Sequence, residues 1–387
     1  MSWVTYFASA VSAISLIVWA YLVLARGFFW LSSVRDDKSP PAPAVWPAIA
    51  AVVPARNEAD SIADGLNSLL RQDYPGLLSI YLVDDNSDDG TGDIARRLAA
   101  STPPRHLQVI SGAALPPGWT GKLWAVKQGI AAAEATAPDY VLLTDADIVH
   151  APDSVSWLVA HARQGGYVLS SFMAKLRCTS LAERIHVPAF IFFFQMLYPF
   201  RWVRQPRNRT AGAAGGCMLV DTKALRAAGG IEAIRNALID DCTLARRLKT
   251  QGPIWLGLTE RAHSLRPYDS FAEVKQMIAR SAYAQLRFSP WLLAGTILGM
   301  ALVYLAPVLC ALFVPGLARW LGLAAWLIMA AVFQPTLRFY KLSPLWGLAL
   351  PGIALLYMYY TLESAYRHAR RRGGEWKGRV HVNATSV

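Results

Sequence analysis

The chain has 387 residues, of which 54% are hydrophobic and 17% charged, and its formal net charge is +12. This composition is too apolar for an ordinary soluble domain and indicates membrane segments. The positive charge is typical of basic segments beside anionic lipid head groups, and it could also help to hold an anionic substrate. Because the basic residues cluster beside apolar segments, we do not expect nucleic acid as a partner. The four cysteines form no Cys-x-x-Cys pair, so neither a zinc site nor a disulfide framework is indicated.

The first apolar run, residues 4–25, contains no charge and is long enough to span a bilayer as a helix. A cleaved signal peptide is the competing interpretation, but no basic residue precedes the run and its apolar core is too long. Arg26, Arg35 and Lys38 follow, so the positive-inside rule places the next domain in the cytoplasm. The proline-rich residues 39–47 indicate a stiff linker.

Strand and helix patterns alternate after this linker, which predicts an α/β domain with a mostly parallel sheet. The predicted strands are 48–54, 80–83, 107–110, 140–144, 167–172 and 217–220, and the predicted helices are 58–70, 91–99 and 123–134.

The segment 185–200 is rich in aromatic residues, and four arginines follow it between positions 201 and 209. An apolar helix with a basic end is typical of a segment that lies on anionic lipid. A helix buried in a protein core explains the apolar part equally well. The sequence leaves both interpretations open.

Three further uncharged apolar runs follow, at residues 291–314, 320–337 and 342–362. The last two are separated by only four residues, which predicts a tight helical hairpin. Because the runs contain no charged residue, we do not expect a transport pathway through them. The tail 367–379 carries six Lys or Arg residues, and three crossings would place it outside, against the positive-inside rule. The number of C-terminal spans therefore stays open.

The predicted strand 140–144 ends in two aspartates one residue apart, Asp145 and Asp147. Open α/β sheets bind ligands at the carboxyl ends of their strands. A hard divalent cation, held by one or two carboxylates plus substrate phosphates, would fit this position. The alternative is a loop with solvated aspartates, so the motif alone does not establish a metal site.

Two other acidic clusters lie at element ends. Asp85 follows the second strand, where a carboxylate can bind a base or ribose, while Asp88 or Asp89 can cap the next helix. Asp240 and Asp241 open a predicted helix, where acids suit the helix dipole. A carboxylate there could also accept a proton from an attacking hydroxyl.

Two polar or flexible motifs complete the set. Gly121-Lys122 does not satisfy the P-loop pattern, but Lys122 can neutralise a phosphate. The pair Gly215-Gly216 allows a ligand to approach the backbone closely.

In this order the motifs resemble those of family 2 glycosyltransferases. The motifs are residues 53–58, 83–89, 121–122, 145–147, 215–218 and 240–248. With the flanking apolar runs, the whole chain is most similar to the hopanoid-associated membrane glycosyltransferases of bacteria, and more distantly to ceramide glucosyltransferases.

The resemblance implies a GT-A fold, with a Rossmann-like, mostly parallel sheet and N- and C-terminal transmembrane helices. It implies inverting transfer from a nucleotide-sugar donor, a UDP-sugar in the first instance, with Mg²⁺ or Mn²⁺ as cofactor. The implied donor-binding residues are Pro54, Ala55, Arg56, Glu58, Asp85, Lys122 and Asp145. The implied metal ligands are Asp145 and Asp147, the acceptor-side residues Gly216 and Arg280, and the catalytic residues Asp240 and Asp241, with Asp241 as the base.

Two motifs depart from the family pattern. The base motif is usually Glu-Asp, whereas here it is Asp240-Asp241. The Gln-x-x-Arg-Trp motif of many membrane members is not intact, since the nearest candidates are Gln276 with Arg280 and Gln285 with Arg287. The resemblance therefore does not extend to processive polymerisation.

The resulting expectation is an enzyme of the bacterial inner membrane whose catalytic domain faces the cytoplasm. The expected parts are an anchor and linker at 1–47, the catalytic domain at 48–290, a transmembrane region at 291–362 and a basic tail at 363–387. The expected acceptor is a lipid such as a hopanoid. The alternatives are transfer to polyprenyl phosphate and a catalytically silent nucleotide-binding scaffold.

Overall fold

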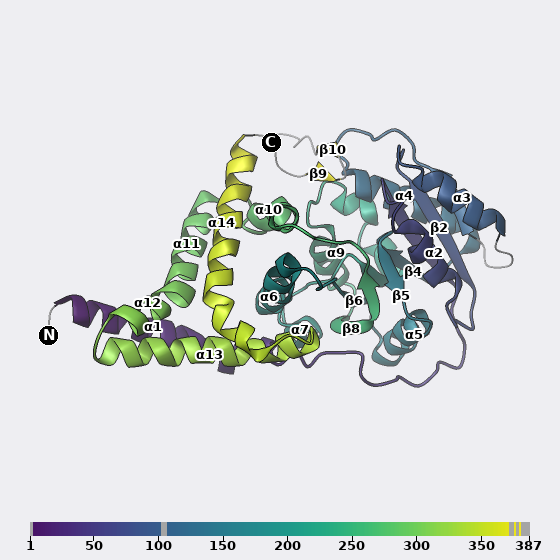
Figure 1. Ribbon diagram of the computed structural model, residues 1–387. Coiled ribbons are helices and arrows are strands. Elements are labelled where there is room, and N and C mark those ends of the chain that lie inside the picture. Colours follow the sequence, from purple (N-terminus) through teal and green to yellow (C-terminus); the bar gives the residue numbers. More distant parts are fainter. Residues whose placement is uncertain (1–2, 102–106, 371–374, 377–378, 381–387) are drawn as a thin grey trace. The chain divides into compact units, whose positions relative to one another are not determined.

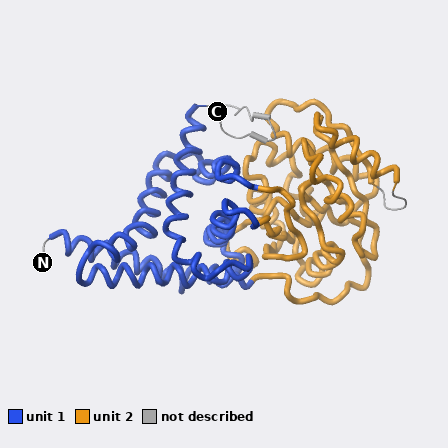
Figure 2. The backbone as a smooth tube through the Cα atoms, in the orientation of Figure 1, with its two compact units in different colours: residues 1–33, 178–201, 268–374 blue, residues 34–177, 202–267, 375–387 orange. Residues whose placement is uncertain are grey.

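The computed structural model describes residues 3–101, 107–370, 375–376 and 379–380. The chain forms two compact units (Figure 2). Unit 1 comprises residues 1–33, 178–201 and 268–374, and unit 2 comprises residues 34–177, 202–267 and 375–387. Two segments within the range expected for the catalytic domain thus belong to the unit that contains the apolar helices.

Unit 2 is built on a mixed eight-stranded sheet in the order β3-β2-β1-β4-β7-β6-β8-β5 (Figure 1). Six of its strands run in one direction, and β7 and β5 run in the other. The strands are β1 (Ile49–Ala55), β2 (Leu78–Asp84), β3 (Leu107–Ser111), β4 (Tyr140–Thr144), β5 (Ile148–His150), β6 (Leu169–Lys175), β7 (Cys217–Asp221) and β8 (Ile254–Ser264). A short antiparallel pair, β9 (Glu375–Trp376) and β10 (Arg379–Val380), lies apart from this sheet.

The reversed strand β7 explains how one edge of the sheet collects the predicted motifs. Strands β1, β2 and β4 are parallel, so their carboxyl ends meet at one edge. Strand β7 pairs antiparallel with β4, with Thr144 opposite Cys217. The residues that precede β7, Gly215 and Gly216, therefore reach the same edge as the residues that follow β4.

Helices with buried apolar side chains cover the sheet. The α-helices of unit 2 are α2 (Ile62–Leu70), α3 (Thr91–Ser101), α4 (Gly121–Ala133), α5 (Ser154–Gly165), α8 (Thr222–Ala227) and α9 (Asp240–Leu248). Ile62, Leu66 and Leu69 of α2 are buried, as the helical spacing predicts. The 3-10 helices η2 (Glu134–Thr136) and η3 (Ile231–Ile234) complete this layer, and α7 (Phe200–Val203) lies where the chain passes between the units.

Unit 1 is helical. Its helices are α1 (Trp3–Leu24), α6 (Leu181–Leu197), α10 (Phe271–Gln285), α11 (Pro290–Met300), α12 (Ala306–Phe313), α13 (Leu317–Phe339) and α14 (Leu350–Ala369), with short helices η1 (Phe29–Leu31), η4 (Ala301–Leu305) and η5 (Pro344–Ala349). The π-helical η4 joins α11 to α12, so that 290–313 is one continuous helical stretch.

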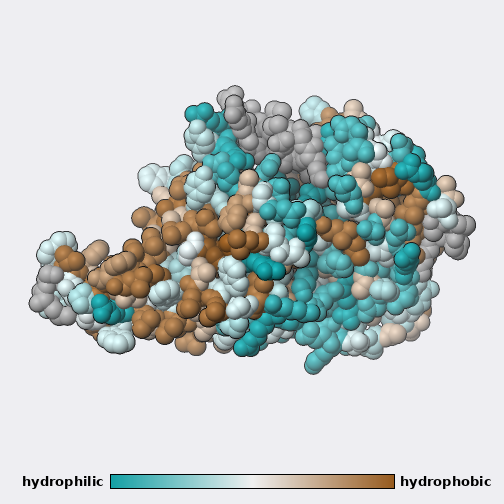
Figure 3. Space-filling model, in the orientation of Figure 1, coloured by the Kyte–Doolittle hydropathy of each residue, from teal (hydrophilic) through white to brown (hydrophobic). Residues whose placement is uncertain are grey.

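Four helical stretches of unit 1 are long and apolar enough to cross a membrane. These are Trp3–Leu24, Pro290–Phe313, Leu317–Phe339 and Pro344–Ala369. Large apolar side chains on them are exposed, among them Trp3, Trp291, Phe313 and Trp320. Figure 3 shows hydrophobic surface gathered over these helices. Apolar exposure of this extent is expected where lipid covers a surface.

Helix α6 is a core helix of unit 1, which decides between the two interpretations of the aromatic segment. Its Phe192 is completely buried and contacts the rings of Phe29 and Phe333, with centroids 5.3 and 5.2 Å away. A capping box starts the helix, because Ser180 accepts from Glu183 N while the Glu183 carboxylate accepts from Ser180 N. The segment therefore packs on protein.

The predicted tight hairpin between the last two apolar runs is wrong in part. Only η5 folds back along α13, where Trp326 donates to the carbonyl of Leu348 and Gln334 to that of Pro344. Helix α14 then turns away from α13 (Figure 1). Pro344 is the first residue of η5 and Pro351 the second residue of α14, and a proline is compatible with the first turn of a helix. The basic tail lies partly outside the described residues.

Helix α2 supports the loop that carries Asp145 and Asp147 through a glycine contact. A Cβ atom at Gly65 would lie 2.6 Å from the carbonyl oxygen of Ala146 and 3.3 Å from that of Ile148. Because both neighbours are backbone atoms, neither can move without displacing the loop. We expect Gly65→Ala to destabilise the protein by about 1–3 kcal/mol, as overpacking does.

A thermal unfolding curve in detergent measures this effect. Gly299→Ala is the control, since a Cβ atom there meets nothing within 4 Å. An unchanged melting temperature for Gly65→Ala would contradict the role of this contact.

Candidate active site

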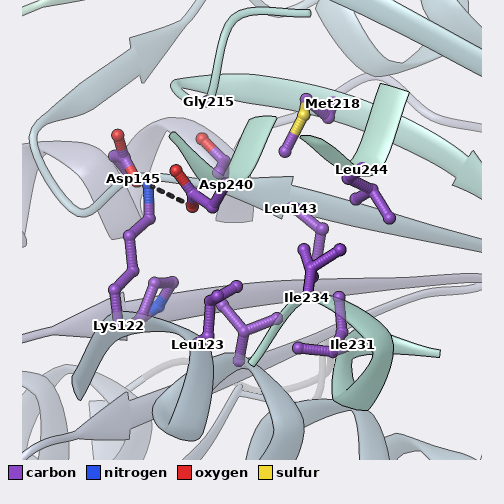
Figure 4. A pocket seen from close by; sticks show the side chains of 13 residues that line it. Lys122, Leu123, Leu143, Asp145, Gly215, Met218, Ile231, Ile234, Asp240 and Leu244 are labelled. Carbon is purple, nitrogen blue, oxygen red and sulfur yellow. Dashed lines mark ion pairs between the residues drawn. The ribbon is translucent and has the colours of Figure 1, made fainter. Parts of the chain in front are cut away.

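The site is centred on the ammonium group of Lys122, the second residue of α4. Its Nζ lies 2.8 Å from Oδ1 of Asp145 and 3.5 Å from Oδ2 of Asp240 (Figure 4). Burial alone would lower the pKa of Lys122, but these carboxylates raise it, so the side chain stays charged. A cation in the first turn opposes the helix dipole. The position of Lys122 is therefore explained by the carboxylates and not by the stability of α4.

The carboxylate of Asp241 faces the backbone before β7. Its Oδ2 accepts from Gly215 N at 3.0 Å, and its Oδ1 accepts from Cys242 N at 2.6 Å. Burial and the negative charge of Asp240 raise the pKa of Asp241 to about 6, although both hydrogen bonds and Lys122 oppose the shift. The geometry thus holds a weakly basic carboxylate in a fixed orientation.

Gly215 allows these groups to come together. A Cβ atom at this position would lie 3.3 Å from Lys122 Nζ and 3.6 Å from Asp241 Oδ2. Only a residue without a side chain leaves that space open, as the paired glycines predict.

Asp147 belongs to a second, adjoining network. Its Oδ2 accepts from the hydroxyl of Ser264 at 2.7 Å and from Nε of Arg266 at 3.3 Å. Arg266 also pairs with Glu58, at 2.6 Å. The loops after β1, β4 and β8 are therefore joined by one arginine.

The loops after β1 and β2 are also linked. Arg56 donates to the backbone carbonyls of Asp85 and Asn86. Asn57 donates its backbone N–H to Ser87, and its side chain accepts from Asp88 N. Hydrogen bonds thus join the two loops that carry most of the expected nucleoside-binding residues.

A buried relay connects β5 to the glycine loop. Thr144 Oγ1 lies 2.9 Å from the carbonyl oxygen of Gly216 and 2.9 Å from Nε2 of His150. A carbonyl only accepts, so the hydroxyl donates to Gly216 and His150 Nε2–H donates to the hydroxyl. Asp145 N also donates to Gly216 O, at 3.3 Å. Burial lowers the pKa of His150 to about 4, so the ring stays neutral and the relay fixes the spacing of the two loops.

A pocket opens beside the carboxylates. Lys122, Asp145 and Asp240 lie on its polar side (Figure 4). Its apolar walls are formed by Leu123, Val126, Leu143, Met218, Ile231, Ile234 and Leu244. Among the residues described here, no group of three or more His, Cys, Asp and Glu side chains is arranged to hold a metal ion.

The structure places the predicted residues as follows. It brings Lys122, Asp145, Asp240, Asp241 and Gly216 together at one edge of the sheet, with Asp147, Glu58, Arg56 and Asp85 on the adjoining loops. Pro54 and Ala55 end β1, and Pro54 lines the pocket.

Arg280 is exposed on α10 of unit 1, and its acceptor-side role stays a prediction. Ser264 and Arg266 were missed, since no local motif marks them. Only the pairing of β8 with β5 brings them to Asp147. Asp89 caps α3, as one of the two interpretations predicts, by accepting from Thr91 N and Oγ1.

Two family models match the chain. Glycosyl transferase family 2 matches residues 50–229, and glycosyl transferase family group 2 matches residues 140–360, more than half of the chain.

The curated relatives are similar over a limited region. An N-acetylglucosaminyltransferase of Mesorhizobium japonicum is 35% identical over 120 residues, which are 31% of this chain and 26% of that protein. An N-acetylglucosaminyltransferase of Rhizobium meliloti is 36% identical over 118 residues, 30% of this chain and 26% of that protein. The match thus spans about a quarter of the length of these relatives.

A solved structure is similar over nearly the whole chain. It is a mannosyltransferase from Pyrobaculum calidifontis in complex with GDP-Man and Mn²⁺, with a TM-score of 0.54 at 20% identity, and the match covers 94% of this chain and 99% of that chain. This similarity confirms the predicted GT-A fold with apolar helices at both ends. The family matches confirm the prediction of a glycosyltransferase-type enzyme, and the chain belongs to glycosyl transferase family group 2.

Proposed function

We propose that the chain is a membrane-bound, inverting glycosyltransferase that transfers a sugar from a nucleotide-sugar donor to a hydroxyl of a lipid acceptor. The observation that carries the proposal is the arrangement around Lys122, where Asp145 and Asp240 share one ammonium group and Asp241 is fixed beside them. This arrangement combines a charged donor site and a candidate base at one sheet edge.

Asp241 is the proposed general base. With a pKa of about 6 it is ionised at neutral pH, yet basic enough to take the proton of an attacking hydroxyl. Its hydrogen bonds to Gly215 N and Cys242 N keep the carboxylate oriented. The acceptor hydroxyl would approach along the Gly215-Gly216 loop, which leaves room for it.

The nucleoside of the donor is proposed to lie on the linked loops after β1 and β2. Pro54 and Ala55 supply backbone there, Arg56 holds the loop of Asp85, and Glu58 is fixed by Arg266. Lys122 would neutralise one charge of the diphosphate.

Mg²⁺ or Mn²⁺ fits the residues present, because Asp145 and Asp147 offer hard carboxylate oxygens of the kind these ions prefer. On Asp147 only Oδ2 receives the bonds from Ser264 and Arg266, which leaves Oδ1 for a ligand. When bound, the metal would supply a Lewis acid that neutralises charge on the leaving diphosphate. The small number of protein ligands is consistent with completion of the site by donor phosphates.

The proposed acceptor is a lipid because four helical stretches have the length and composition of membrane spans. The sequence resemblance favours a hopanoid, and polyprenyl phosphate is the second candidate. The location that we propose is the bacterial inner membrane, with unit 2 in the cytoplasm, where nucleotide sugars are made. The donors named for the similar proteins make N-acetylglucosamine and mannose nucleotides the first to test.

Donor screening with the purified, detergent-solubilised protein tests the proposal. Nucleotide sugars are supplied with Mn²⁺ or Mg²⁺ and a total lipid extract, and glycolipid products are separated by mass and charge. We expect one donor to give a product that disappears with a chelator and with Asp147→Ala. Turnover that survives both treatments would exclude the metal site, and a product that carries phosphate would replace the hydroxyl acceptor by polyprenyl phosphate.

The assignment of Asp241 predicts the effect of one substitution. Asp241→Asn should lower kcat by about 10²–10⁴-fold, the usual contribution of a general base, while the Kd of the donor changes little. Single-turnover kinetics and donor titration measure the two quantities. Asp93→Asn, at an exposed carboxylate paired with Arg96, is the matched control. Normal turnover in Asp241→Asn would remove Asp241 from the mechanism.

The same assignment predicts the pH dependence of kcat. Because the base must be ionised, kcat should fall as the pH drops through about 6. Asp240→Asn removes a charge that raises the pKa of Asp241, so this limb should move to lower pH. Lys122→Gln removes a charge that lowers the pKa, so the limb should move to higher pH. Shifts in the same direction for both variants would rule out Asp241 as the titrating group.

A further inference from the structure

Unit 2 carries an exposed cluster of five arginines, which we call the arginine surface. It consists of Arg204, Arg207, Arg209, Arg246 and Arg247, and all five are exposed. Within the described part of the chain, none of them pairs with a carboxylate. No Asp or Glu occurs in residues 202–220 or 242–259, so no acid close in sequence offsets this charge.

Lys249 ties the two parts of this surface together. Its ammonium donates to the carbonyl oxygens of Trp202 at 3.3 Å, Val203 at 2.8 Å and Thr210 at 2.5 Å. The three donors of the ammonium are thereby used on both ends of the loop 204–209. Burial lowers the pKa of Lys249 to about 8. Lys249 caps the C-terminus of α9, so the loop is held against the helix that carries Arg246 and Arg247.

A purely structural explanation covers only part of this surface. Arg246 and Arg247 in the last turn of α9 suit the negative end of the helix dipole. That explanation does not apply to the three arginines of the loop, which lie outside any helix. The side chain of Asn208 accepts from Thr210 N, and the resulting turn leaves the three loop arginines exposed to solvent.

We propose that the arginine surface binds the anionic head groups of the bilayer that holds the apolar helices. Guanidinium groups match phosphate oxygens with two parallel hydrogen bonds, so arginine is the expected residue for such contacts. Because four helical stretches of the chain could cross a membrane, a bilayer is the anionic surface that these arginines would meet. Each basic residue near an anionic membrane surface contributes about a fivefold gain in affinity. The inference does not depend on the proposed sugar transfer.

The test uses the full chain in a non-ionic detergent, titrated with micelles of short-chain phosphatidylglycerol, with micelles of phosphatidylcholine, and with soluble glycerol phosphate. We expect the wild type to bind the phosphatidylglycerol micelles more tightly than the other two, and high salt to remove the preference. The triple variant Arg204→Gln/Arg207→Gln/Arg209→Gln should bind these micelles roughly a hundredfold more weakly.

The matched control is Arg71→Gln/Arg97→Gln/Arg226→Gln, which removes the same charge from exposed positions elsewhere on unit 2. It should keep at least most of the wild-type affinity. Hydrogen exchange in phosphatidylglycerol nanodiscs adds a local readout, because residues 204–209 should be protected relative to phosphatidylcholine nanodiscs. Equal binding by the two triple variants would overturn the proposal. Equal affinity for glycerol phosphate and the micelles would replace the membrane by a soluble anion.

Discussion

The ammonium group of Lys122 is the interaction on which the site depends. Asp145 and Asp240 contact it directly, and Asp241 lies close enough to be affected by its charge. Burial and neighbouring carboxylates raise the pKa values of Asp145 and Asp241, and the charge of Lys122 opposes both shifts. Lys122 does so from a helix position that its charge does not favour. The electrostatics therefore explain why a lysine, and not a neutral residue, stands in the first turn of α4.

The sheet topology brings the residues of this cluster to the same edge. A purely parallel sheet would bring the ends of β1, β2 and β4 together, but it would place the residues before β7 at the far edge. Because β7 is reversed, Gly215 and Gly216 arrive beside Asp145. Their backbone groups then bind Asp241 on one side and the Thr144–His150 relay on the other. One antiparallel strand thus joins the loop of Asp145 and the carboxylate of Asp241 in a single hydrogen-bonded structure.

The sequence predicted the parts of this site that depend on local patterns. Apolar runs located β1, β2 and β4, and the acids at the strand and helix ends marked Asp85, Asp145 and Asp241. The features that the sequence did not predict depend on contacts between residues that lie far apart in the chain. Strand β8 was not predicted, and with it Ser264 and Arg266 were missed, because their role arises only when β8 pairs with β5. The aromatic helix α6 is equally apolar whether lipid or protein covers it, so only the packing of Phe192 decided the matter.

The nine residues of helix α9 carry acidic side chains at one end and basic side chains at the other. Its first turn carries Asp240 and Asp241, where acids suit the positive end of the dipole, and its last turn carries Arg246 and Arg247, where cations suit the negative end. Both ends are also tied to the chain outside the helix, by Gly215 N at the acidic end and by Lys249 at the basic end. The charge pattern that stabilises α9 thus gives the helix one acidic end and one basic end, each held to a neighbouring loop.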